Sequence, residues 1–113
     1  MDIEEIRKFC LMLPHTEEDI KWEDHLCFTI GKKIYCLTDL KDPFKACIKV
    51  TPEDFHDLTQ NGNAMQAAYM AKGQWVLIKD TSKIKKKDFQ RLLKDSYQLV
   101  KSKLTKKMQQ ELS

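Results

Sequence analysis

The chain has 113 residues, 42% of them hydrophobic and 33% charged, and a formal net charge of +3. These values predict a single folded domain over residues 1–113 and exclude a disordered chain. The short apolar runs predict no membrane-spanning helix and the acidic N-terminus predicts no signal peptide, so we expect a cytoplasmic protein.

Residues 2–13 predict the first helix. Its apolar stripe is formed by Ile3, Ile6, Cys10 and Leu13, which recur at helical spacing. Asp2 and Glu5 have the spacing of a capping box, and Pro14 ends the helix. We expect the acidic segment that follows, residues 15–24, to be a connector.

Residues 26–30 and 33–38 predict two strands joined by a Gly-Lys dipeptide. Glycine at the first turn position favours a type II′ hairpin turn. The resulting register pairs Phe28 with Tyr35 on one apolar face.

The segment 44–50 alternates between apolar and polar side chains. Phe44, Ala46, Ile48 and Val50 would face a core, whereas Lys45, Cys47 and Lys49 would face solvent. This pattern predicts a strand in a sheet with one packed side and one solvent-exposed side.

The second half of the chain predicts two more helices and one more strand. Thr51 and Pro52 start a short helix that ends near Gly62. The remaining predictions are a connection at 63–73 with one helical turn at 65–70, a strand at 74–79, a long helix at 85–104 and a frayed tail from residue 106. The long helix would bury Phe89, Leu92, Leu93, Ser96, Val100 and Leu104.

The predicted fold class is α+β, an antiparallel twisted sheet with the N- and C-terminal helices packed on one face.

The four cysteines, Cys10, Cys27, Cys36 and Cys47, form no CxxC motif and lie at no zinc-finger spacing. In a reducing compartment we expect free thiols that pack as small apolar side chains. The predicted hairpin sets Cys27 opposite Cys36, where a disulfide would need oxidising conditions.

Charge is distributed unevenly along the chain. Residues 1–26 carry a balance of −5 and residues 83–107 a balance of +8. Two interpretations stay open: the two ends attract each other across one fold, or the basic end meets a polyanion.

The solvent-exposed sheet face is the first candidate site. The predicted cations are Lys33, Lys45, Lys49 and Lys72, with Lys32 at the hairpin tip, and the aromatic candidates are Trp75, then Tyr35 or Tyr69. Such a face could hold phosphates and stack an unpaired base, with little sequence specificity because lysine does not form bidentate contacts to bases. The alternative is that the lysines only keep an open sheet soluble and that Trp75 belongs to the core.

Other candidate sites are weaker. The lysines of the C-terminal helix lie on several sides and are typical of a solvated helix face. The acidic residues Glu17, Glu18, Asp19, Glu23 and Asp24 lack an EF-hand pattern. Cys27 and His25 are the closest pair for nucleophilic catalysis, without a recognisable nucleophile elbow or oxyanion hole. We therefore predict no enzyme activity, no metal site and no cofactor.

An ordered set of short motifs carries a family resemblance. It comprises Leu13-Pro14, Trp22, the strand-Gly-Lys-Lys-strand hairpin, Thr51-Pro52-Glu53, Tyr69-Met70-Ala71-Lys72 with Trp75, Ser96-Tyr97 and Leu104-Thr105-Lys106-Lys107. Together these motifs resemble the MmcQ/YjbR family of small bacterial proteins. The resemblance implies a CyaY-like, or frataxin-like, α+β fold and DNA binding with a "double wing" contact. Relatives often carry glycine where this chain has His15, and His or Asn beside the Trp where it has Gln74 and Val76.

The sequence and the resemblance together predict a monomeric, non-enzymatic protein that binds DNA or another polyanion with low sequence specificity. The predicted contacts are Lys33, Lys45, Lys49, Lys72, Trp75 and Tyr35. The alternatives are a small protein-interaction or ligand-binding module that uses the same face, or a frataxin-like metal binder.

Overall fold

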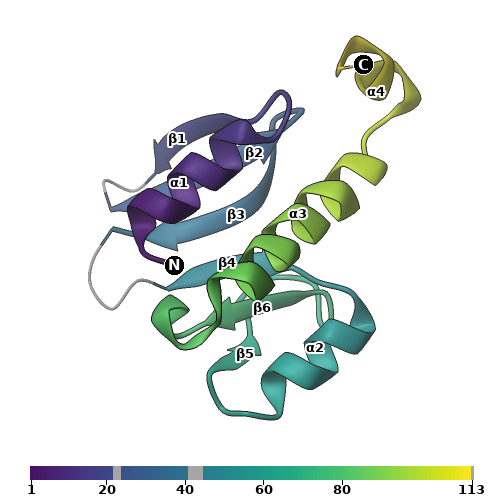
Figure 1. Ribbon diagram of the computed structural model, residues 1–113. Coiled ribbons are helices and arrows are strands. Elements are labelled where there is room, and N and C mark those ends of the chain that lie inside the picture. Colours follow the sequence, from purple (N-terminus) through teal and green to yellow (C-terminus); the bar gives the residue numbers. More distant parts are fainter. Residues whose placement is uncertain (22–23, 41–44, 113) are drawn as a thin grey trace.

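The computed structural model describes residues 1–21, 24–40 and 45–112 (Figure 1). The strands are β1 (Glu17–Lys21), β2 (His25–Ile30), β3 (Lys33–Asp39), β4 (Ala46–Lys49), β5 (Ala64–Gln66) and β6 (Trp75–Ile78). They form one antiparallel sheet in the order β1-β2-β3-β4-β6-β5. The helices are α1 (Ile3–Met12), α2 (Pro52–Thr59), α3 (Lys86–Ser102) and α4 (Lys106–Leu112), with a 3₁₀ turn η1 at Thr81–Lys83. The predicted α+β fold class is confirmed.

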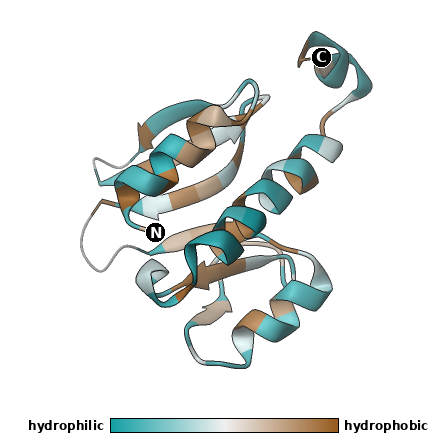
Figure 2. Cartoon of the chain, viewed as in Figure 1, coloured by the Kyte–Doolittle hydropathy of each residue, from teal (hydrophilic) through white to brown (hydrophobic). Residues whose placement is uncertain are grey.

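Helices pack against one face of this sheet and enclose the core (Figure 1). α3 packs across β3 and β4, and its buried residues include Phe89, Leu92, Leu93, Ser96 and Val100, as predicted. Figure 2 shows hydrophobic and hydrophilic positions alternating along α3, the pattern of a helix with one buried side. The predicted core positions of the fourth strand, Ala46, Ile48 and Val50, are buried as well.

The helix starts follow the predicted capping chemistry. The Asp2 carboxylate accepts a hydrogen bond from the Glu5 backbone N–H at 2.9 Å, and the Asp2 N–H donates to the Glu5 carboxylate at 3.2 Å. Thr51 caps α2 through the N–H of Asp54, and Pro52 occupies its first turn. The turn after α1 places His15 at φ 63°, the left-handed conformation that a glycine adopts more readily.

Three elements differ from prediction. The acidic connector contains the edge strand β1, whose mostly exposed, charged residues give no apolar alternation and discourage further strand pairing. The predicted connection after α2 contains β5, an edge strand of only three residues, and no helical turn at 65–70. The predicted frayed tail forms α4, because the Thr105 hydroxyl accepts from the Met108 N–H and Met108 packs against the core.

The β2–β3 hairpin also differs in turn type and register. Gly31 and Lys32 both have positive φ, 56° and 68°, which is a type I′ turn and not the predicted type II′ turn. A β-bulge shifts the register, so that Phe28 lies opposite Cys36 and not opposite Tyr35. As a result Tyr35 and its neighbour Cys36 are both buried.

The bulge also removes the predicted pairing of Cys27 with Cys36, and all four cysteines are free. Trp22, Glu23 and Phe44 lie outside the described residues. Across the ranges that the structure describes, none of the helices has both the length and the apolar character that a membrane crossing requires.

Candidate nucleic-acid interface

The site begins where β3 and β4 separate. The two strands pair only from Cys36 and Ile48 to Thr38 and Ala46. Beyond that point the Ser96 side chain of α3 stands between them, donating to the Tyr35 carbonyl at 2.6 Å and accepting from the Lys49 N–H at 2.9 Å. One buried hydroxyl thus replaces a direct strand-to-strand hydrogen bond.

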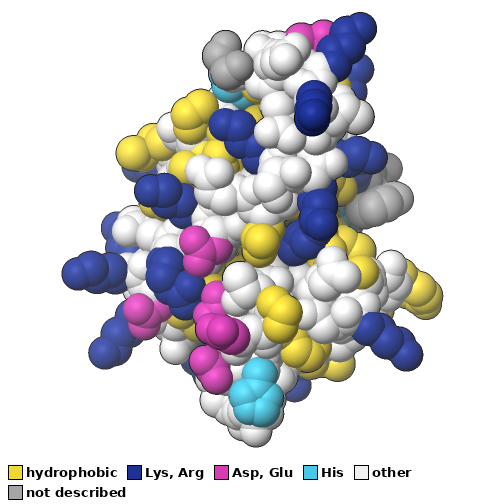
Figure 3. All heavy atoms as spheres, turned by 90° about the vertical axis from the view of Figure 1, so that its right-hand side faces the viewer, with side chains coloured by type: hydrophobic (Ala, Val, Ile, Leu, Met, Phe, Trp, Pro, Cys, Tyr) yellow, Lys and Arg dark blue, Asp and Glu magenta, His cyan; other side chains and the backbone are white. Residues whose placement is uncertain are grey.

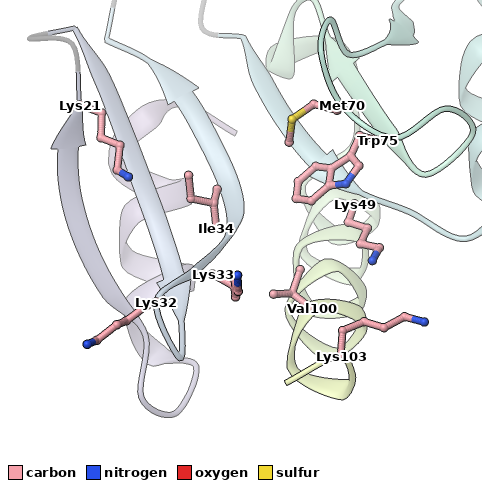
Figure 4. A pocket seen from close by; sticks show the side chains of 9 residues that line it. All are labelled: Lys21, Lys32, Lys33, Ile34, Lys49, Met70, Trp75, Val100 and Lys103. Carbon is pink, nitrogen blue, oxygen red and sulfur yellow. The ribbon is translucent and has the colours of Figure 1, made fainter. Parts of the chain in front are cut away.

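The separated strand ends open a cavity of about 410 Å³ on the sheet face away from α1 (Figure 4). We call it the lysine cleft; its lining residues are Lys21, Lys32, Lys33, Ile34, Lys49, Met70, Trp75, Val100 and Lys103. In Figure 4 the β1–β3 strands form one wall, and α3 with β4 and β6 forms the other. Ile34 and the Trp75 indole project into the gap from these two walls.

Five of the nine lining residues are lysines, and no acidic residue lines the cleft. Among residues 1–21, 24–40 and 45–112, no carboxylate lies within salt-bridge distance of these five ammonium groups. Concentrated charge of one sign beside an apolar, low-dielectric wall attracts anions from solution. Figure 3, which views the α3–α4 side, shows most acidic side chains in one group and another at the far end of the molecule, while Lys and Arg project over much of the surface.

The interior of the cleft is apolar. Trp75 lies directly opposite Lys49 in the β4–β6 pair, and both side chains point to the open sheet face. The indole is half-buried: one part packs against the core and another lines the cavity. Ile34, Met70 and Val100 complete the apolar lining.

The cleft brings together only half of the predicted site. Lys33, Lys49 and Trp75 line it, whereas Lys45 and Lys72 are exposed elsewhere on the surface. The prediction for Tyr35 is wrong because this residue is fully buried. Its ring makes an edge contact with Tyr97, with centroids 5.4 Å apart, and its hydroxyl bonds to Thr16 at 2.8 Å. Burial raises the pKa of Tyr35, and no ligand can stack on it.

Two of the remaining lysines could not be assigned to this site from sequence, whereas Lys32 was placed beside it at the hairpin tip. Lys103 belongs to a helix whose lysines are typical of a solvated face, and Lys21 to an acidic segment expected to be a connector. The sequence does mark Ser96, because a small polar residue inside the apolar stripe of a helix often forms a hydrogen bond with a backbone group.

The hairpin tip is held against the C-terminal segment. A Cβ atom at Gly31 would lie 2.8 Å from a methyl carbon of Leu104 and 3.2 Å from Met108. This close approach fixes Lys32 and Lys33 on one wall of the cleft relative to Lys103 on the other.

We therefore expect Gly31→Ala to destabilise the protein by about 1–3 kcal/mol, through the left-handed backbone and the clash with Leu104. Urea unfolding would measure the change. Gly62→Ala is the matched control, because Gly62 also has positive φ but a Cβ atom added there would have no neighbour within 4 Å. Equal losses in the two variants would contradict a role for the close packing.

The other charges of the basic helix are partly paired within the fold. Lys86 lies 2.9 Å from Glu5 of α1, and this contact lowers the pKa of Glu5. Arg91 contacts Asp54 of α2 and Asp95. The basic end is thus attracted to acidic residues of the N-terminal half, and it also contributes Lys103 to the cleft.

Within the described residues, the acidic side chains considered for metal binding do not come together at one point. Glu18 binds Arg7 through two contacts of 2.8 Å, and this pairing lowers the pKa of Glu18. Neighbouring strand positions such as Asp19 point to the opposite face. The described residues contain no group of three or more His, Cys, Asp or Glu placed to hold a metal ion.

The loop between β5 and β6 forms the rim of the cleft near Trp75. The Gln66 amide donates to the carbonyls of Ala67 and Met70, at 2.9 and 3.2 Å, and its oxygen accepts from the Gly73 N–H at 2.9 Å. These bonds fix a loop in which Tyr69 is fully exposed at φ 64°.

Comparisons with known proteins agree with this architecture. The family model YjbR matches residues 11–99. The Deinococcus radiodurans protein DR2400, described with the domain DUF419, is 30% identical over 97% of this chain and 86% of its own, with a TM-score of 0.85. A Pseudomonas syringae protein, 22% identical over 88% of this chain and 99% of its own, has a TM-score of 0.73 and shows the fold alone. A search of curated proteins finds no match.

The family match covers more than half of the chain and includes every lining residue of the lysine cleft except Val100 and Lys103. The resemblance first indicated by the ordered motifs is therefore confirmed: the chain belongs to the YjbR family.

Proposed function

We propose that this protein binds nucleic acid at the lysine cleft with low sequence specificity, as a monomeric, non-enzymatic protein of the cytoplasm. The observation that carries the proposal is the set of five lysines around an apolar cavity that also contains an indole. Ammonium groups bind phosphates, and aromatic rings stack on bases of any identity. The resemblance to proteins described as DNA-binding supports the same function.

Low specificity follows from the chemistry of the lining. Sequence recognition needs groups such as Arg, Asn or Gln that make paired hydrogen bonds to base edges. The lining residues are lysines and apolar side chains, which provide charge and contact area only.

A non-enzymatic role is supported by the state of the nearest nucleophiles. Cys27 is buried, and burial raises the pKa of its thiol. Burial also raises the pKa of Cys47, on the same sheet face, to about 11. An activated cysteine shows the opposite shift. His25 bonds to Asp24 and Asp39, at 2.7 Å each.

The salt dependence of binding tests the proposal. If about four phosphates are contacted on a single strand, the log–log slope is near −3, and affinity falls about fiftyfold between about 50 and 200 mM salt. Fluorescence anisotropy with a labelled oligonucleotide would measure it. No binding at low salt, or an affinity unaffected by salt, would contradict the proposal.

A protein-interaction module is the second candidate, at a different surface from the predicted sheet face, because an apolar surface lies outside the cleft. Ile20 is 59% exposed and Leu40 40% exposed, beside a cavity of about 600 Å³ between α1 and the β1–β2 strands. Pull-down with and without nuclease distinguishes the two candidates: a partner that survives nuclease and is lost in Ile20→Lys favours protein interaction.

A further inference from the structure

We infer that the lysine cleft is a site for one unpaired nucleotide, so that the protein prefers a single strand to a duplex. The inference rests on the proposed function and assigns the class of nucleic acid to it. It also assigns Tyr69 as a second stacking residue. Four features of the molecule support it: the size of the cavity, the position of Trp75, the placement of the lysines and the conformation of the β5–β6 loop.

The cavity has the size of a small-molecule site. A volume of about 410 Å³ lies within the range of pockets that enclose single small ligands, about 300–1,000 Å³. A double helix does not fit into a cavity of this volume, whereas one base turned away from its neighbours does. Bases of a duplex would have to leave the stack first, which opposes binding by a few kcal/mol.

The interior matches the face of a base. The Trp75 indole projects into the gap, and Ile34 and Val100 bound the same space (Figure 4). A planar base entering between them would gain stacking on one side and apolar contact on the other. These contacts require an unpaired base, because a paired base exposes only its edges in the grooves.

The charges lie where the backbone of such a nucleotide would remain. Lys32 and Lys33 belong to the hairpin wall, and Lys49 and Lys103 to the opposite wall. In Figure 4 the Lys33 side chain lies at the gap, whereas those of Lys32 and Lys103 point outward from it on opposite sides. Phosphates that remain outside the cavity, on either side of an inserted nucleotide, can therefore meet ammonium groups from different walls of the cleft.

Tyr69 provides an independent observation. A left-handed backbone is unfavourable for a bulky side chain, and residues held in such conformations cluster at ligand-binding sites. The loop nevertheless holds Tyr69 at φ 64° with its side chain fully exposed, next to the cavity-lining Met70. The exposed aromatic ring of the residue before Met70 is available to stack on the base beside the inserted one.

The experiment compares three probes in the Trp22→Phe variant, in which Trp75 is the only remaining tryptophan. The probes are a twelve-nucleotide thymidine strand, a GC-rich hairpin duplex of equal charge, and thymidine monophosphate. Each is titrated at low salt, with anisotropy for the two labelled oligonucleotides and tryptophan fluorescence for all three. We expect the single strand to bind at least about tenfold more tightly than the duplex and to quench Trp75.

Each outcome separates the inference from the function it rests on. Equal affinity for strand and duplex, or binding of the strand without quenching, overturns the unpaired-nucleotide site and leaves the proposed function standing. No binding of either oligonucleotide overturns both. Thymidine monophosphate binding as tightly as the strand overturns the proposed nucleic-acid function, because a free nucleotide is then the ligand, and leaves the one-nucleotide site standing.

Three variants test the two named aromatic residues. Trp75→Leu should weaken single-strand binding about tenfold or more, whereas Trp75→Phe, which keeps a stacking face, should largely retain it. Tyr69→Asn keeps a residue that tolerates the left-handed backbone, so the fold is unaffected and only strand affinity should fall, severalfold. Unchanged affinity in Tyr69→Asn overturns the role of Tyr69.

Discussion

Replacing Lys33, Lys49 and Lys103 together with glutamate should abolish nucleic-acid binding at low salt. The three residues come from β3, β4 and the end of α3, and they meet only at the cleft. Each substitution removes a phosphate contact and adds a repulsive charge, so we expect affinity to fall at least about a hundredfold. Anisotropy with a labelled single strand would measure the loss, and circular dichroism would show whether the fold persists.

The matched control changes the same amount of charge elsewhere. Lys8, Lys87 and Lys94 are exposed residues of α1 and α3, on the helix-covered side of the sheet. Their triple glutamate variant has the same net charge as the cleft variant but keeps the cleft intact. Binding should fall far less in this control. An equal loss in both variants would show that net charge attracts the nucleic acid and that the cleft has no special role.

Ser96→Ala should lower the free energy of unfolding by about 2–4 kcal/mol, although it removes a single oxygen atom. The Ser96 hydroxyl is fully buried; it donates a hydrogen bond to the Tyr35 carbonyl and accepts one from the Lys49 N–H. Without it two backbone groups are left buried without a partner, at about 1–3 kcal/mol each. Urea unfolding would measure the change.

Ser102→Ala provides the control for that substitution. Ser102 is also in α3, but it is exposed and its hydroxyl donates only to the Leu99 carbonyl of its own helix. Its replacement should change stability by no more than about 0.5 kcal/mol. If Ser96→Ala were equally mild, the strand separation would not depend on the serine bridge.

The elements that could be predicted from sequence are those whose patterns arise within a few residues. The capping box at Asp2 and Glu5 and the buried stripe of α3 depend on local spacing, and both are confirmed. β1 could not be predicted, because its pairing with β2 is tertiary and its side chains show no apolar alternation. The bulge at Tyr35 has no turn residue to mark it, so the predicted register of the hairpin is wrong.

The candidate site shows the same division. Strand alternation correctly placed Lys49 on the open sheet face. Trp75, within the predicted last strand, was the first choice for the stacking aromatic residue. Lys103 joins them only because Leu104 packs on Gly31 and brings the end of α3 to the hairpin tip, a contact between residues more than seventy positions apart. Tyr35 was misplaced for a related reason, since the bulge turns it toward α1 and α3.

The most direct test of the central claim is an NMR titration of the nitrogen-15-labelled protein with a short thymidine strand at low salt. If the strand binds in the lysine cleft, the shifted amide signals should belong to the β2–β3 hairpin tip, Lys49, the loop before Trp75 and the end of α3. Signals of α1 and the outer side of α2 should stay unchanged. Shifts confined to the helix-covered side, or no shifts at saturating strand, would contradict the claim.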